Sequence, residues 1–122
     1  MNESELKSQL VRMLKKMAPA LVVFRHEDIR TAGIPDMSVT GGGRTTWWEY
    51  KFADPDIEDT ELQRRTCLLL NRAGFCRYVV WSRTEDGDHT FVMVPGDAGI
   101  EAQCVGFSMA WLAAYIYSVH RF

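Results

Sequence analysis

The sequence has no apolar run that approaches the ~20 residues needed to cross a bilayer. Its most apolar stretch, from Phe107 to Ile116, is interrupted by Ser108. The acidic N-terminus, Met1 to Glu5, lacks the basic start and apolar run of a secretory signal. We therefore expect an intracellular protein without a membrane partner.

Cysteine is also scarce, and its number and spacing argue against both a disulfide framework and a structural zinc site. Cys67, Cys76 and Cys104 are odd in number and follow no metal-ligand spacing. Neither a disulfide framework nor a zinc site is expected, and the thiols are interpreted as small apolar groups.

Glycine is present, but not as a phosphate-binding loop, which would join a strand to a helix. The run Gly41-Gly42-Gly43 lies between two predicted strands instead. This disfavours an ordinary ligand-binding α/β protein, and we expect no organic cofactor.

Excess basic charge is missing too, because the net charge is −2. Binding of nucleic acid by electrostatics alone is therefore not expected.

The chain has 122 residues, 47% of them hydrophobic, which predicts one globular domain with a core. Residue spacing predicts helices over Glu3 to about Met17, Thr60 to Ala73 and about Phe107 to His120. It predicts strands over Leu21 to Arg25, Asp36 to Thr40, Thr45 to Phe52, Phe75 to Ser82 and His89 to Val94. The order predicts an α/β domain with a mixed central sheet flanked by helices.

The single domain is expected to have its core in residues 1–94, followed by a glycine-rich connection. The last helix, about residues 106–120, is rich in apolar side chains. It either packs on the core or contacts a second copy in a homodimer. Two-fold pairing would suit a junction substrate with two equivalent cuts.

Two carboxylates and a lysine are predicted to converge at one end of a hairpin. Side chains alternate along a strand, so Glu49 and Lys51 share one face while the aromatic Trp48 and Tyr50 face the core. The glycine turn brings Asp36 beside this pair. Taken singly, Asp36 is also typical of a turn, and Glu49 with Lys51 of a surface ion pair.

With Gly33-Ile34-Pro35-Asp36 before the hairpin and Glu49-Tyr50-Lys51 within it, the sequence resembles the PD-(D/E)XK nuclease superfamily. Within it, the chain is similar to the VRR-NUC type related to Holliday-junction resolvases, from the first helix to about Ser82. The resemblance implies a restriction-endonuclease-like fold. It also implies a Mg²⁺-dependent endonuclease that hydrolyses phosphodiester bonds in DNA and is specific for branched or junction structures, with Mn²⁺ as a substitute metal.

The resemblance also implies a role for each site residue. Asp36 and Glu49 would bind the metal through carboxylate oxygens, and Tyr50 through its main-chain carbonyl. Lys51 would orient the attacking water or stabilise the transition state. Gln63 matches a glutamine that family members carry after this strand, where it would hold a water or a phosphate.

A glutamate on the first helix is implied near the metal, and both Glu3 and Glu5 are candidates. Glu3 is preferred because it continues the stripe of Leu10 and Leu14, although either acid also suits the first turn of a helix. Four arginines are candidates for binding DNA phosphates: Arg25, Arg30, Arg64 and Arg65. The three histidines are interpreted as structural or surface residues: His26, His89 and His120. The alternative function is a catalytically silent nucleic-acid-binding or assembly module.

Overall fold

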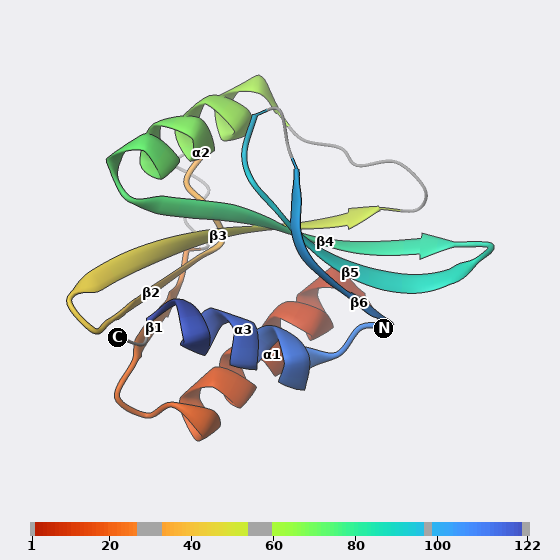
Figure 1. The fold of residues 1–122 in the computed structure, drawn as a ribbon, viewed down its shortest axis with the longest axis horizontal. Helices are drawn as coiled ribbons and strands as arrows, with labels where there is room; N and C mark the ends of the chain where they lie inside the picture. Colours follow the sequence, from red (N-terminus) through yellow and green to blue (C-terminus); the bar gives the residue numbers. More distant parts are fainter. Residues whose placement is uncertain (1, 27–32, 54–59, 97–98, 121–122) are drawn as a thin grey trace.

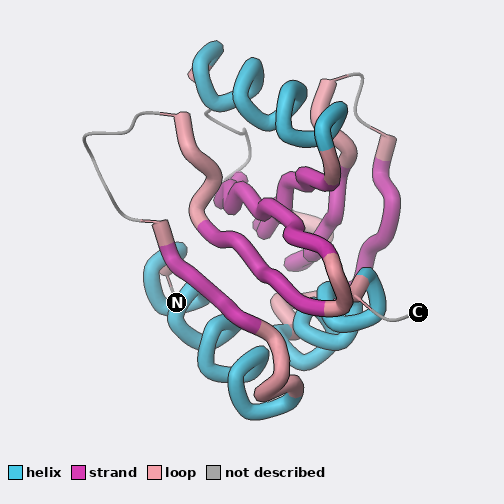
Figure 2. The backbone as a smooth tube through the Cα atoms, turned by 90° about the vertical axis from the view of Figure 1, so that its left-hand side faces the viewer, coloured by secondary structure: helices cyan, strands magenta, loops and turns pink. Residues whose placement is uncertain are grey.

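The computed structural model describes residues 2–26, 33–53, 60–96 and 99–120 as one mixed six-stranded sheet between helices (Figures 1 and 2). The elements in chain order are α1 (Glu3–Met17), β1 (Val22–Arg25), β2 (Met37–Gly41), β3 (Arg44–Ala53), α2 (Glu61–Ala73), β4 (Phe75–Thr84), β5 (Gly87–Met93), β6 (Ile100–Val105) and α3 (Met109–Val119). The strands lie in the sheet in this same order. Only β3 and β4 pair in parallel, because α2 carries the chain across one face between them.

The helices form one layer on each side of the sheet. In Figure 1, α2 lies above the sheet, and α1 and α3 lie together below it. The side chains of the hydrophobic core are packed between the sheet and the helices α1 and α3. Its largest fully buried side chains include Trp48, Trp81, Tyr50, Leu6, Leu10, Leu14, Leu112 and Ile116. The core therefore includes α3, which packs on the sheet of its own chain.

Local signals explain where the helices begin and end. Asn2 accepts a hydrogen bond from the Glu5 backbone N–H and caps α1. At the start of α2, the Thr60 and Gln63 side chains each bond the other residue's backbone N–H, which is a capping box. Ser108 caps α3 in the same way as Asn2 caps α1. The three predicted helices are thus confirmed.

The predicted hairpin is also confirmed. Its turn residues Gly42 and Gly43 have φ angles of 62° and 79°, which glycine adopts at little steric cost. The imidazole of His120, just after α3, is buried beside the turn, where Nδ1 donates to the Gly41 carbonyl at 2.9 Å. This histidine is structural, as expected, and it ties the end of α3 to the hairpin.

One predicted connection is wrong, because residues 100–105 form the edge strand β6 rather than part of a glycine-rich loop. The usual alternation of apolar side chains is weak there. Ile100 and Val105 are 53% and 82% exposed, and the partly buried side chains between them, Ala102 and Cys104, are small. Residues 100–105 form a strand because they pair with β5, and nothing in their own sequence indicates that pairing.

The three cysteines are free thiols, and Cys67 and Cys76 are buried, as predicted. No helix in the described ranges is long and apolar enough to cross a membrane.

Candidate active site

The pairing of β2 with β3 places Asp36 next to Glu49. Met37 lies opposite Trp48, so the next step along this antiparallel ladder brings the two acidic residues opposite each other. The Asp36 carboxylate is fixed there, because its Oδ2 accepts a hydrogen bond from the Tyr50 backbone N–H at 2.8 Å. The hairpin thus brings the two predicted metal ligands together.

The Glu49 carboxyl group is buried between the sheet and α2, with 2% of the residue exposed. Its Oε1 lies 3.7 Å from Lys51 Nζ, but its Oε2 has no hydrogen-bond partner in the described part of the chain. Burial, followed by the negative charge of Asp36, raises the pKa of Glu49 to about 9, although Lys51 opposes the shift. A buried carboxyl oxygen without a partner is costly, so this position suits a group that binds oxygen.

Lys51 is held in place by the first turn of α2. Its ammonium group donates to Gln63 Oε1 at 2.7 Å, and the same oxygen accepts the Thr60 backbone N–H at 3.0 Å. The capping box that starts α2 therefore also orients Lys51. Glu49 and Lys51 are not a surface ion pair, because both side chains are at least nine-tenths buried.

Lys7, which the sequence analysis did not select, links α1 to the site. Its Nζ lies 3.1 Å from Asp36 Oδ1 and 3.2 Å from Glu3 Oε1. Burial lowers the pKa of Lys7, but Asp36 and Glu3 raise it more, so the net pKa is above its usual value. The feature of the sequence that could have identified Lys7 is its i, i+4 spacing from Glu3, which allows the two side chains to pair on one face of the helix.

The first-helix glutamates differ in their contacts. Glu3 reaches the site through Lys7, whereas the Glu5 carboxylate accepts a hydrogen bond from the exposed Asn2 amide. Across the described ranges, no three His, Cys, Asp or Glu side chains are close enough to hold one metal ion. Glu3 therefore reaches Asp36 only through Lys7, whereas Asp36 and Glu49 are brought together by the hairpin.

The backbone before Asp36 fits closely against α2. Gly33 has a φ of 90°, and a Cβ added there would lie 2.8 Å from Leu62 Cγ. A side chain at this position would therefore clash with α2 as well as strain the backbone. The small residue lets the loop approach the helix and sets the course of the chain into Asp36.

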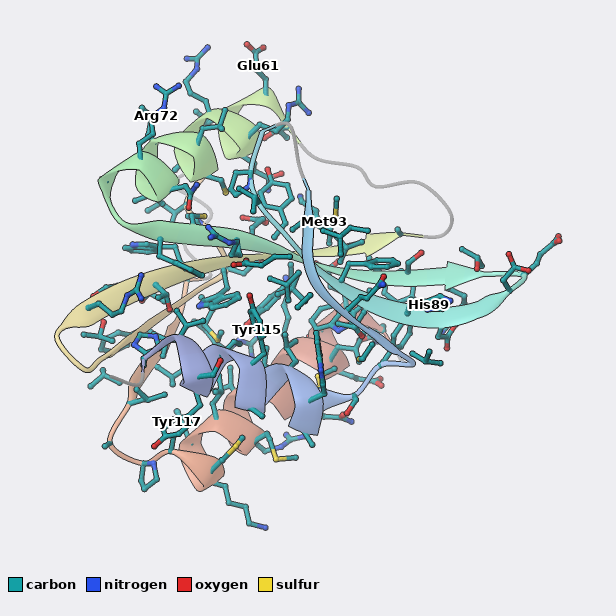
Figure 3. All side chains as sticks on the ribbon, in the orientation of Figure 1. Glu61, Arg72, His89, Met93, Tyr115 and Tyr117 are labelled. Atoms are coloured by element: carbon teal, nitrogen blue, oxygen red, sulfur yellow. The ribbon has the colours of Figure 1, made fainter. Side chains whose placement is uncertain are left out.

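The described candidate phosphate-binding arginines come from two different elements, α2 and β1. Arg64 and Arg65 line a cavity of about 330 Å³ with Arg72 and Gly96. Figure 3 shows Arg72 and Glu61 projecting from α2 away from the sheet. Arg25, on β1, donates to Ser8 Oγ at 3.3 Å. The fourth candidate, Arg30, lies outside the described residues.

A cation of the Mg²⁺ type fits the donors that the structure brings together. Mg²⁺ prefers oxygen and commonly binds through one or two carboxylates together with water and substrate phosphate. Asp36 and Glu49 provide the carboxylates, and Oε2 of Glu49 provides an oxygen that has no hydrogen-bond partner within the described ranges. The residues present are therefore suited to such a metal.

No protein-family model and no curated protein sequence matches the chain. Among solved structures, it is similar to Hjc, a Holliday junction resolvase from the archaeal hyperthermophile Archaeoglobus fulgidus, with a TM-score of 0.53. The match covers 90% of this chain and 98% of that chain, at 11% sequence identity. The two proteins thus share a fold over nearly their whole length, and the mixed sheet flanked by helices is the predicted architecture.

Proposed function

We propose that this chain is a Mg²⁺-dependent endonuclease of the VRR-NUC type that cuts phosphodiester bonds in branched DNA. The observation on which the proposal depends is that Asp36 lies opposite the buried Glu49 beside Lys51, with one Glu49 oxygen that has no hydrogen-bond partner among the described residues. A fold shared with a Holliday junction resolvase supports DNA as the substrate. A homodimer would present two such sites, which would suit two equivalent cuts in a junction.

In this proposal, Asp36, Glu49 and the Tyr50 main-chain carbonyl hold the metal, and Mn²⁺ can replace Mg²⁺. The metal would supply a Lewis acid for the phosphate and lower the pKa of a water molecule. Lys51 lies close enough to the carboxylates to orient that water or to stabilise charge on the phosphate oxygens. Gln63 acts through Lys51 by accepting one of its hydrogen bonds.

A cleavage assay tests this function directly. Four-way junction, flap, duplex and single-stranded DNA are incubated with Mg²⁺, Mn²⁺ or EDTA, using the wild-type chain and Asp36→Asn. We expect junction cleavage with either metal, none in EDTA, and a loss of roughly 10³-fold in Asp36→Asn. Cleavage that persists in EDTA would contradict the metal site. Junction binding without cleavage of any substrate would instead support the silent binding module.

Glu3→Ala is expected to lower the rate of cleavage by about tenfold, because groups that orient metal ligands commonly contribute this much. Glu3 holds Lys7, and Lys7 contacts the proposed ligand Asp36. The matched control is Glu5→Ala, which should change the rate by less than about twofold. Thermal melts of both variants correct for any change in helix stability. A larger loss in Glu5→Ala would assign the helix-borne acid to Glu5.

A further inference from the structure

A row of side chains that includes the exposed Phe24 and the partly exposed Trp47 lies next to the carboxylate pair on the same face of the sheet. The register pairs Phe24 with Ser38, and Ser38 with Trp47. Trp47 and Glu49 are two residues apart on β3, so they share a face and lie about 7 Å apart along the strand. The row thus runs beside the one that contains Asp36 and Glu49.

Aromatic rings dominate this row, and α2 leaves them accessible. Among the described residues, the main contacts of this helix with the sheet are to β3 and β4 rather than to β1 and β2. Phe24 is 57% exposed, and Trp47 is partly exposed. The imidazole of His26 lies against the indole of Trp47, with ring centroids 5.3 Å apart, and its Nε2 is 2.8 Å from Ser38 Oγ. Hydrogen bonding thus fixes one ring against another.

A cationic cavity adjoins Trp47. It has a volume of about 350 Å³, and its lining includes Arg44, Thr45 and Phe75. The Arg44 guanidinium lies 5.1 Å from the Phe75 ring and donates to the Val119 carbonyl at the end of α3 at 3.1 Å, so it is held toward the α3 face of the sheet, opposite to Trp47. The rings rather than the cation therefore carry the inference, because aromatic side chains on which bases stack are a common feature of proteins that bind single-stranded nucleic acid.

We propose that Phe24, His26 and Trp47 form a stacking platform for unpaired bases next to the phosphate that is cut. Stacking needs an open base face, and the faces of bases inside a duplex are covered by their neighbours. The platform would therefore select DNA with an unpaired segment at the cutting position, such as a splayed strand at a branch. This inference rests on the proposed nuclease site and specifies its substrate.

Binding in EDTA tests the platform without requiring cleavage. Fluorescence anisotropy is measured with a labelled single-stranded oligonucleotide and with a blunt duplex of the same sequence. Trp47→Ala and Phe24→Ala should each weaken single-strand binding roughly tenfold, and duplex binding by less than about twofold. Trp47→Phe keeps a ring and should retain most of the affinity. The control is Tyr117→Ala, an exposed aromatic on α3 at the opposite sheet face, which should change neither.

Two results would overturn the platform. One is an equal or absent effect of Trp47→Ala on the two DNA forms. The other is a shift of Phe24→Ala from dimer to monomer in sedimentation, which would make this face a contact between copies. If the predicted binding losses occur but no substrate is cleaved with metal, the platform stands as a binding surface and the nuclease function fails. The two proposals therefore fail separately.

Discussion

Glu49→Gln is expected to abolish cleavage and at the same time to stabilise the metal-free protein at neutral and alkaline pH. The amide cannot supply the anionic oxygen that the proposed metal needs, so the rate should fall by roughly 10³-fold. The expected gain in stability has a different cause. Burial and the neighbouring Asp36 raise the pKa of Glu49 from 4.5 to about 9, so the folded protein favours the protonated form.

The sign of the pH dependence follows from this raised pKa. The stabilisation from the protonated carboxyl is fully present below about pH 4.5 and is lost as the pH rises through about 9. Glutamine resembles the protonated acid and does not titrate, so the variant should avoid this loss. Urea unfolding in EDTA, from about pH 5 to about pH 9, measures it. Glu85→Gln, in an exposed turn, is the control. A parallel decline of wild type and Glu49→Gln would contradict the explanation.

Lys51→Ala is expected to reduce the single-turnover rate by roughly 10² to 10³-fold while changing DNA affinity little, because its charge acts on the reacting phosphate. Lys51 is 3.7 Å from a Glu49 oxygen and is almost fully buried. Few phosphates of a bound DNA can contact it other than the one at the metal. The matched control is Lys15→Ala, which removes an exposed lysine on α1.

Gln63→Ala helps to interpret the Lys51 result. Gln63 accepts a hydrogen bond from the Lys51 ammonium group and completes the capping box of α2. Its loss should therefore slow cleavage about tenfold without weakening DNA binding. Thermal melts separate this effect from the lost helix cap. A Lys51→Ala protein that cleaves within about threefold of wild type would remove Lys51 from the catalytic machinery.

The sequence by itself determined the elements whose signals are local. Helical spacing marked all three helices, and the glycine run marked the hairpin turn. The two-residue period of a strand then predicted that Glu49 and Lys51 share a face, opposite the core aromatics. Each inference needs only residues within one element or one turn, so backbone geometry was sufficient.

Only the tertiary structure decided how the site is enclosed. Three features depend on segments that are distant in sequence. Helix α2 covers Glu49 and Lys51, Lys7 extends from α1 to Asp36, and β6 pairs at the edge of the sheet. The exposure of Phe24 likewise depends on which strands α2 covers, which no strand pattern reveals. Burial depends on which surfaces meet in three dimensions. The raised pKa of Glu49 and the accessibility of Trp47 are therefore properties of the packed molecule rather than of either residue's neighbours in sequence.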